Sequence, residues 1–327
     1  MIVLGIESSC DETGVAVVKN GKEILSSVVA SSLKLHSKHG GVIPEIASRL
    51  QLESIAGVFN QAIANAKIDL KQIDLVAVTS GPGLPGSLLV GISFAKALAL
   101  SLNKPLLGVN HIYSHIYSNI LCHKNIKLPA VALVVSGGHT SLFYVKDFPK
   151  FYVLGQTRDD ACGEAFDKIA KIMGLGYPGG PLIEALARNG DKNKIKFACS
   201  GMNNEMDFSF SGIKTAVFYY LKNKKITLRL KQDLAASFQE SVVNVLIKKS
   251  LMACKHKKVS NLLIGGGVIA NTYLRQKITQ AAKKEGINCY FPDTLLCMDN
   301  AAMVAGLGGY LYKKGEVSNF YLNMEFS

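Results

Sequence analysis

The chain has 327 residues, enough for two domains that each bury a hydrophobic core. Hydrophobic residues make up 48% of it, charged residues 19%, and there are 30 glycines, which excludes a disordered or collagen-like protein. The 37 Lys and Arg outnumber the 24 Asp and Glu, and the net charge of +13 favours a polyanionic partner, although a general solubility feature explains it equally well.

The first half of the chain predicts a β-meander followed by alternating helices and strands. Apolar, β-rich runs at 2–7, 14–19 and 23–30 are typical of strands. Apolar side chains at helical spacing from Pro44 to about Ala66 predict an amphipathic helix, with proline in the first turn that tolerates it. The other elements expected are a strand at 74–79, a glycine turn at 80–83, a helix at 87–102, a strand at 106–109 and a helix at 110–121.

The second half repeats this order. Its meander is expected at 130–135, 141–145 and 151–156, and helices follow. A strand at 261–264 then runs into a glycine turn and a helix, as the strand and glycine turn of the first half do. The repetition indicates an internal duplication.

A duplication of this kind predicts an α/β fold with two lobes. We expect an N-terminal lobe over 1–127, a C-terminal lobe over 128–303, and a helix at about 304–327 that packs back on the first lobe. Ligands of α/β proteins usually bind where the turns after the strands face a crevice. The predicted ligand site is therefore a cleft between the lobes.

The chain has no feature that predicts export or membrane insertion. No basic segment precedes the first apolar run, which reaches an acidic residue at Glu7, so we expect no signal peptide. The longest apolar stretch, Leu88 to Leu102, contains Lys96 and is shorter than the ~20 residues of a membrane span. The cysteines form no CxxC pair and are typical of reduced thiols; they stand at 10, 122, 162, 199, 254, 289 and 297. We expect a soluble, cytoplasmic protein.

Two glycine turns could bind phosphate through backbone amides, because glycine lets the backbone approach a ligand closely. One is Val134-Val135-Ser136-Gly137-Gly138-His139 and the other is Gly265-Gly266-Gly267. Each alone could be only a tight connection, but their place in the duplicated order favours binding. The chain has no GxxxxGK[ST] sequence and so lacks the P-loop fingerprint.

The turn after the first strand, Glu7-Ser8-Ser9-Cys10-Asp11-Glu12-Thr13, holds three carboxylates. They could orient a water molecule, bind a cation near phosphates or act as a base, and Asp11 at the tip is the preferred functional residue. Ordinary turn chemistry of Asp and Ser is an equal alternative.

His111 and His115 are four residues apart in a predicted helix, so both imidazoles lie on one face. This is the spacing of a two-histidine metal clamp, although such a pair can equally be a packing pair. Ile112 stands where the zinc peptidase motif HExxH has its glutamate. Asp299 is a reasonable third ligand, and two imidazoles with a carboxylate suit Fe(II) or Zn(II).

With these residues in view, the sequence resembles the bacterial TsaD family, formerly Gcp or O-sialoglycoprotein endopeptidase, whose members are tRNA N6-adenosine threonylcarbamoyltransferases. The resemblance runs nearly end to end through long motifs in the same order. These are Gly5-Ile6-Glu7-Ser8-Ser9-Cys10-Asp11-Glu12-Thr13, Gly40-Gly41-Val42-Ile43-Pro44-Glu45, Ala47-Ser48-Arg49, Gly81-Pro82-Gly83-Leu84, Val135-Ser136-Gly137-Gly138-His139-Thr140, Asp159-Asp160-Ala161, Gly163-Glu164-Ala165-Phe166-Asp167-Lys168, Tyr177-Pro178-Gly179-Gly180-Pro181, Asp207-Phe208-Ser209-Phe210-Ser211-Gly212-Ile213-Lys214-Thr215 and Gly265-Gly266-Gly267-Val268.

The resemblance implies the fold shared by actin, sugar kinases and heat-shock chaperone ATPases. It implies that one divalent metal ion, Fe²⁺ first and Zn²⁺ or Mg²⁺ as alternatives, is held by His111, His115 and Asp299. With the boundary at 303, that ion would join the two lobes. An adenine nucleotide, either threonylcarbamoyl-AMP or ATP/ADP, would be bound by Val134, Val135, Ser136, Gly137, Gly138, Asp167, Gly180 and Asn271. The implied catalytic residues are Asp11, Glu12 and His139.

The resemblance also implies a reaction and partners. The N6 amine of adenosine 37, in tRNAs that read ANN codons, would attack the threonylcarbamoyl carbonyl of threonylcarbamoyl-AMP. The chain would be the catalytic subunit of a complex with a TsaB-like paralogue and a TsaE-like ATPase, and a separate synthase would supply the adenylate. No membrane partner is implied.

Three positions depart from the family pattern: Gln51 and Asn110, where members often carry histidine, and Pro85 in a glycine loop. Three other functions are open. A metallopeptidase would lack the glutamate of HExxH, while a nucleotide-dependent chaperone or a sugar kinase would give the histidine pair no role. Two basic clusters could bind tRNA or could be solvated faces: Lys222, Lys224, Lys225, Arg229 and Lys231, and Lys248, Lys249, Lys255, Lys257 and Lys258.

Overall fold

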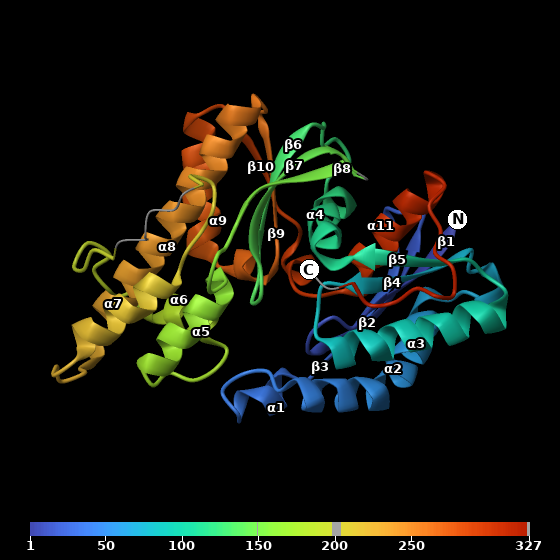
Figure 1. Ribbon diagram of the computed structural model, residues 1–327, viewed down its shortest axis with the longest axis horizontal. Helices are drawn as coiled ribbons and strands as arrows, with labels where there is room; N and C mark the ends of the chain where they lie inside the picture. The colour runs from blue at the N-terminus through green and yellow to red at the C-terminus, as the bar shows by residue number, and fades with distance from the viewer. Residues whose placement is uncertain (149, 198–203, 326–327) are drawn as a thin grey trace. The chain divides into compact units, whose positions relative to one another are not determined.

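The computed structural model describes residues 1–148, 150–197 and 204–325, so Cys199 lies outside the described residues. The chain forms two compact units. The first comprises Met1–Asn125 and Pro292–Ser327, and the second comprises Ile126–Phe291. Each unit is built on one five-stranded mixed sheet with helices (Figure 1).

The first unit has the strand order β3-β2-β1-β4-β5. The meander is antiparallel, and β1, β4 and β5 run parallel. The strands are β1 (Ile2–Glu7), β2 (Glu12–Lys19), β3 (Glu23–Ser31), β4 (Leu75–Gly81) and β5 (Leu106–Asn110). The helices are α1 (Leu33–Ser37), α2 (Pro44–Ala66), η1 (Leu70–Gln72), α3 (Pro85–Leu102), α4 (His111–Cys122), α10 (Thr294–Cys297) and α11 (Ala301–Lys313).

The second unit has the strand order β10-β9-β6-β7-β8. Its strands are β6 (Ala130–Val135), β7 (Thr140–Asp147), β8 (Lys150–Gln156), β9 (Asn261–Gly265) and β10 (Asn288–Tyr290). Its helices are α5 (Cys162–Ile172), α6 (Gly179–Ala187), α7 (Ser211–Leu221), α8 (Leu228–Lys257), η2 (Gly267–Ala270) and α9 (Thr272–Lys284).

The two sheets have equivalent pairings. In each, the first strand pairs antiparallel with the next strand of the meander and parallel with a strand that follows helices, so β6 corresponds to β1, β7 to β2 and β9 to β4. The turn between β1 and β2 therefore corresponds to the turn between β6 and β7. The predicted α/β duplication is confirmed.

The two faces of β1 are covered by different helices, because side chains alternate along a strand. Leu4 and Ile6 lie in the core under α2 and α3. Gly5 faces α11 on the other side, and a Cβ at this position would overlap the carbonyl oxygen of Ala301. Glycine is thus required here for the close approach of helix and strand.

The chain returns to the first unit at Pro292 and not near residue 303. The helix that packs back on β1 starts at Ala301 and ends at Lys313, where Gly315 in a left-handed conformation turns the chain. The remaining described segment runs beside β5 and β4, because Ser318 N donates to Leu106 O and Glu325 N to Ser80 O, both at 2.8 Å. Asp299 consequently belongs to the first unit.

Helix α3 is the one helix among the described residues that is long and apolar enough to cross a membrane by length and composition. Its Leu88, Ile92 and Ala95 are buried in the core of the first unit. Its apolar composition is therefore that of a helix that packs in the core.

Candidate metal centre and glycine turns

The two histidines stand on the first two turns of α4, directly after β5. Asn110 caps this helix by accepting a hydrogen bond from Tyr113 N at 3.1 Å, which fixes where the helix begins. The imidazoles of His111 and His115 lie one turn apart with ring centroids separated by 4.6 Å, and both are buried. The departure at Asn110 therefore has a structural role as a helix cap.

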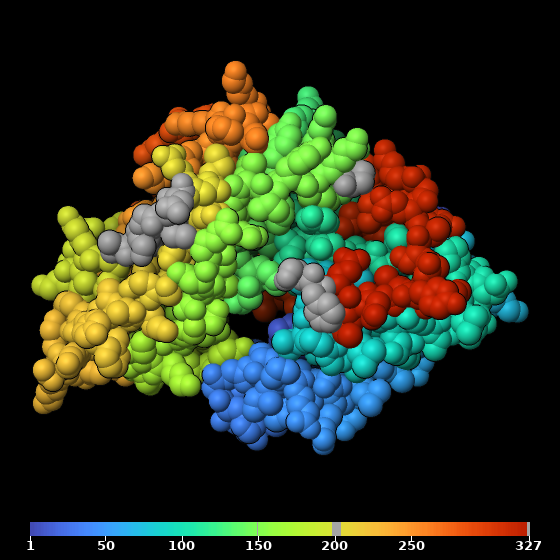
Figure 2. Space-filling view, viewed as in Figure 1, coloured from blue at the N-terminus to red at the C-terminus, as the bar shows by residue number. Residues whose placement is uncertain are grey.

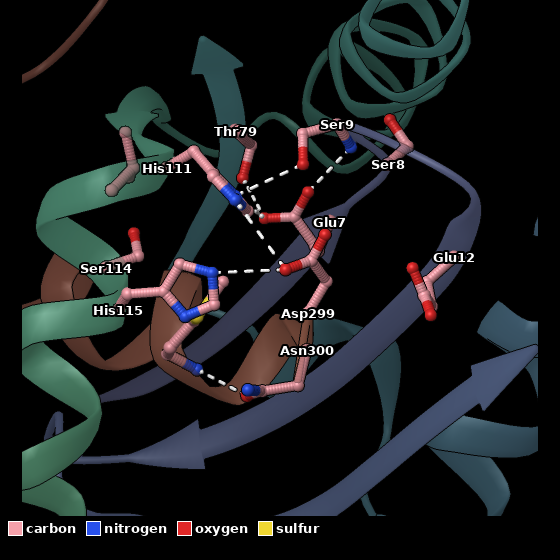
Figure 3. Close-up of polar contacts among 12 residues, drawn as sticks. Glu7, Ser8, Ser9, Glu12, Thr79, His111, Ser114, His115, Asp299 and Asn300 are labelled. Carbon is pink, nitrogen blue, oxygen red and sulfur yellow. Dashed lines mark hydrogen bonds and ion pairs between the residues drawn. The ribbon is translucent and has the colours of Figure 1, made fainter. Parts of the chain in front are cut away.

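Asp299 completes a group of three ligands within the first unit (Figure 3). Its Oδ1 lies 3.1 Å from Nε2 of His115 and 3.6 Å from Nε2 of His111. An ion bound about 2.0–2.2 Å from each of its ligands brings them to roughly 3–3.5 Å from one another. The two Asp299 distances are close to these values and the three ligand atoms lie within 4.8 Å of one another, so the three side chains could hold one divalent ion. All three ligands lie in one unit, so the expectation that this ion joins two lobes is wrong.

Glu7 holds His111 from the other side of the ring. Its Oε2 lies 3.1 Å from Nδ1 of His111 and accepts a hydrogen bond from Thr79 Oγ1 at 2.7 Å. Its Oε1 accepts a hydrogen bond from Ser9 N at 2.6 Å. A carboxylate on one imidazole nitrogen orients the ring and leaves the other nitrogen for a metal. The sequence prediction included Glu7 only as one of three turn carboxylates and missed this role.

Negative charge is crowded around the two histidines. Burial lowers the pKa of His111, but Glu7 and Asp299 more than reverse this and raise it to about 9. Burial raises the pKa of Glu7, and His111 then brings it below its ordinary value. Burial, Asp299 and Asp11 raise the pKa of Glu12 to about 10. A bound cation would offset this negative charge, in agreement with the two imidazoles and the carboxylate that could hold one.

The β1–β2 turn that carries Asp11 and Glu12 is fixed by hydrogen bonds from α3 and its N-terminus. Leu84 N donates to Ser9 O at 2.7 Å, and Ser87 Oγ donates to Cys10 O at 3.0 Å. Asp11 is buried and Glu12 is partly buried. Pro85 occupies the first turn of α3, a position that suits proline, so this departure leaves the helix intact.

Gln51 on α2 is a further organiser of the same turn. It is 1% exposed, and its Nε2 donates to the carbonyl oxygens of Cys10 at 3.0 Å and Glu12 at 2.9 Å, with a longer contact of 3.4 Å to Ser8. The sequence prediction named Gln51 only as a departure. A polar residue on the apolar face of the predicted helix was the available signal.

In the second unit, the β6–β7 turn exposes its backbone. Ser136 N donates to His139 O at 2.8 Å, and His139 N donates to Ser136 Oγ at 3.1 Å. Gly137 and Gly138 are exposed, neither has a positive φ, and a Cβ added at either would meet no atom within 4 Å. Nothing in the described part of the protein requires glycine there, whereas a ligand approaching the backbone would.

The second glycine turn lies beside the first, because β6 and β9 are parallel neighbours and Val134 pairs with Gly265. Gly266 has a φ of +96°, and a Cβ there would overlap the carbonyl oxygen of Val135. Asn271 caps α9 and donates to Gln239 Oε1 at 2.8 Å. Both turns are therefore held at one edge of the sheet.

Helices α5 and α6 bring the remaining predicted ligand residues to this edge. Gly163 N, at the start of α5, donates to Ser136 O at 3.1 Å. Asp167 on α5 accepts from Gly179 N at 2.7 Å, and burial raises its pKa. Gly180 follows at the start of α6, and a Cβ there would meet no atom within 4 Å.

A cavity of about 420 Å³ opens between α6, α8 and α9. It is lined by Glu184, Gln239, Thr272 and Tyr273, among others. Glu184 Oε1 accepts a hydrogen bond from Thr272 N at 2.9 Å. Glu184 lies one helical turn after Gly180 and so on the same face of α6.

Comparison with known proteins gives consistent results. A family model for TsaD, tRNA N6-adenosine threonylcarbamoyltransferase, matches residues 23–306. The tRNA N6-adenosine threonylcarbamoyltransferase of Clostridium kluyveri is 50% identical over 98% of this chain and 95% of its own length. That of Clostridium perfringens is 49% identical over 98% of this chain and 96% of its own length.

The solved structure of HypF from T. kodakarensis shares the fold, with a TM-score of 0.68 at 14% identity. The likeness covers 96% of this chain and 48% of the HypF chain, so the chain spans about half the length of HypF. Together with the equivalent sheets, it confirms the predicted duplicated actin-like fold.

Proposed function

Because the chain belongs to the TsaD family and is a tRNA N6-adenosine threonylcarbamoyltransferase by that membership, we propose that its donor substrate is threonylcarbamoyl-AMP and its acceptor is adenosine 37 of tRNAs that read ANN codons. The observation that carries the proposal is the group of His111, His115 and Asp299 with Glu7 behind it. A nucleotide-dependent chaperone or a sugar kinase has no need of this group.

The ion at this group is Fe²⁺ in our proposal, with Zn²⁺ and Mg²⁺ as alternatives. Two imidazoles and one carboxylate suit Fe²⁺ and Zn²⁺ better than Mg²⁺, which prefers oxygen ligands. When bound, the ion supplies a Lewis acid that stabilises negative charge on the reacting carbonyl or the departing phosphate. Glu7 keeps His111 in the orientation and tautomer that a ligand requires.

The adenylate contacts are the backbone of Val134, Val135, Ser136, Gly137 and Gly138 together with Asp167, Gly180 and Asn271. The open surroundings of the glycines at 137, 138 and 180 support this assignment, since backbone amides without a neighbouring side chain are accessible to phosphate oxygens. Held in this way, the adenylate presents its carbonyl to the incoming amine.

Asp11, Glu12 and His139 are the proposed catalytic residues. As N6 of the adenosine forms its bond to the carbonyl carbon, the nitrogen loses a proton and the bond to the AMP phosphate oxygen breaks. The carboxylate of Asp11 accepts that proton, or that of Glu12 where a bound cation lowers its raised pKa, and His139 donates a hydrogen bond to the departing phosphate. Gln51 keeps the turn of the two carboxylates in place.

Family membership also supports the proposed setting. The chain acts in the cytoplasm, without a membrane partner, as catalytic subunit beside a TsaB-like paralogue and a TsaE-like ATPase. A threonylcarbamoyl-AMP synthase supplies the adenylate.

The test is reconstitution with the proposed partners, supplied threonylcarbamoyl-AMP and unmodified tRNA, followed by mass spectrometry of the nucleosides. We expect N6-threonylcarbamoyladenosine in an ANN-reading tRNA and none in the same tRNA with guanosine at position 37. Absence of product from every tRNA tested, with all partners present, would refute the proposal.

A metallopeptidase is the remaining enzymatic alternative, favoured by the histidine pair alone. Ile112 occupies the position of the glutamate that activates water in HExxH, so we expect no cleavage of glycoproteins or peptides by the purified chain. Metal-dependent cleavage that disappears in His111→Ala would favour the peptidase.

A further inference from the structure

The end of α7 and the start of α8 form a basic and aromatic surface. We call residues 218–229 the α7–α8 tip; it includes the exposed loop between the two helices (yellow to gold in Figure 2). Between Ser211 and Gln232 the sequence has no acidic residue and six basic ones, at positions 214, 222, 224, 225, 229 and 231. All charged side chains of the tip are therefore positive.

Aromatic rings lie among these charges. Phe218 is 58% exposed and Tyr219 is 64% exposed, although large apolar side chains are usually buried. Their ring centroids are 5.9 Å apart in an edge-to-face arrangement. From the loop after this helix, Lys224 places its Nζ 3.3 Å from the ring centroid of Tyr220. Exposed rings beside lysines are the arrangement on which unpaired bases stack while phosphates are neutralised.

The second basic cluster, on the C-terminal half of α8, differs in its contacts. Lys255 forms an ion pair with Glu285 at 2.8 Å. Lys249 donates to the carbonyl oxygens of Glu205 and Asp207, and Lys257 lies over the ring of Tyr144. By contrast, Lys222, Lys224 and Lys225 form no ion pair within the described ranges. Arg229 of the tip does pair with Asp233, at 3.1 Å, so the three lysines of the tip are the charges available to a ligand, and exposed rings lie beside them.

We propose that the α7–α8 tip binds the single-stranded anticodon loop of the tRNA substrate, with loop bases stacked on Phe218 and Tyr219 and phosphates contacted by the tip lysines. This inference rests on the proposed function, because it assigns a surface to that reaction's substrate. A protein partner would need acidic groups facing the lysines and apolar groups facing the rings. A folded RNA loop offers both phosphates and unstacked bases in one ligand.

The first experiment measures binding of the full chain to a fluorescent anticodon stem-loop RNA at several salt concentrations. Phe218→Ser with Tyr219→Ser should weaken binding about tenfold or more, since loss of stacking is costly for each base. Lys222→Glu, Lys224→Glu and Lys225→Glu together should also lower the salt slope by about 2 to 3, at roughly 0.7–0.9 for each phosphate that is no longer neutralised.

The matched control reverses three exposed lysines of the second cluster: Lys248→Glu, Lys255→Glu and Lys258→Glu. It has the same change in net charge, and we expect the affinity for the stem-loop to fall less than threefold. Circular dichroism and adenylate binding check that every variant is folded. If the charge-reversal variant does not fold, the serine pair alone decides, because both rings are exposed and contribute little to the core.

Three outcomes would overturn the inference. Unchanged affinity for the stem-loop in both tip variants would place the RNA site elsewhere. A loss of affinity in the control triple as large as in the tip triple would mean that only the net charge matters. An equal loss for a fully paired RNA duplex of the same length excludes base stacking.

The second experiment separates this inference from the proposed function. In the transferase assay, the tip variants should raise KM for tRNA about tenfold and leave kcat and KM for the adenylate unchanged. If the wild-type chain modifies tRNA and the tip variants have the same KM for tRNA, the proposed role of the tip is wrong and the proposed function stands. A wild-type chain that binds the stem-loop but modifies no tRNA contradicts the proposed function alone.

Discussion

The two equivalent turns of the duplicated fold are built in opposite ways. The β1–β2 turn is buried, carries carboxylates and is tied to α2 and α3 by side-chain and backbone hydrogen bonds. The β6–β7 turn is short and exposed, and its glycines leave open space around the backbone.

In the proposed function, this difference would let one supersecondary unit serve two kinds of ligand. A turn that must hold several carboxylates needs external donors to its backbone, because like charges repel one another. A turn that binds an anion needs accessible amides and no side chain in the way. Substitutions in each unit test this comparison.

The largest effect is expected at the metal group of the first unit. His115→Ala and Asp299→Ala should each lower metal content and transferase activity by about 100-fold or more, since two remaining ligands hold an ion poorly. Elemental analysis and the reconstituted assay measure both quantities. His256→Ala, an exposed histidine on α8, is the control. Full activity in a variant that holds no metal would leave the histidine pair as a packing feature.

The next effect is expected at the exposed turn of the second unit. Gly138→Ala should change the free energy of unfolding by less than about 0.5 kcal/mol, because its Cβ meets no neighbour, yet raise KM for the adenylate about tenfold or more. Gly266→Ala is the counterpart, and it should destabilise the protein by about 1–3 kcal/mol because of its φ of +96°. Urea unfolding and steady-state kinetics separate the two. Wild-type kinetics in Gly138→Ala would show that nothing approaches this turn.

A smaller effect on activity is expected at Gln51. Gln51→Met keeps the approximate volume but removes the amide donor, so the carbonyls of Cys10 and Glu12 lose a buried partner. The free energy of unfolding should fall by about 1–3 kcal/mol, and activity about tenfold as the carboxylate turn loosens. Gln51→His, which retains one ring N–H, should recover part of both. Equal activity in all three proteins would show that the turn holds itself.

The smallest effect concerns a carboxylate of the second unit that is compensated by hydrogen bonds. Burial raises the pKa of Asp159, but hydrogen bonds from Ser209, Phe210 and Ser211 lower it below its ordinary value. The carboxylate therefore stabilises the protein above the unfolded pKa of about 3.9, and this contribution is lost as pH falls through the lower folded value.

Asp159→Asn should accordingly cost at most about 1 kcal/mol near neutral pH after allowance for solvent screening, with activity changed less than twofold. The difference from wild type in urea unfolding should shrink as pH falls below about 4. A difference that stays constant from pH 7 to pH 3 would mean that the carboxylate charge is not what matters.

The strands and most helices of both sheets could be predicted, because buried strands such as 2–7 and 130–135 leave a continuous apolar signal. The histidine pair followed from helical spacing, and Asp299 could be named from the sequence as a reasonable third ligand, which the resemblance also implied. The unit to which Asp299 belongs could not be predicted, because the return of the chain depends on α11 packing against Gly5. Glu7 and Gln51 were missed for the same reason: their partners lie far away in sequence.

The return of the chain at Pro292 has a consequence for biosynthesis. The nascent chain emerges with β1 and both histidines early, but Asp299 and α11 leave the ribosome only after the whole second unit has been translated. Domains that are contiguous in sequence can fold as they emerge, so we expect the second unit to fold before the first is complete. Until α11 arrives, the face of β1 at Gly5 lacks its cover, so we expect the first unit to stay incomplete up to that point. An ion that needs all three ligands could then bind only after Asp299 has been synthesised.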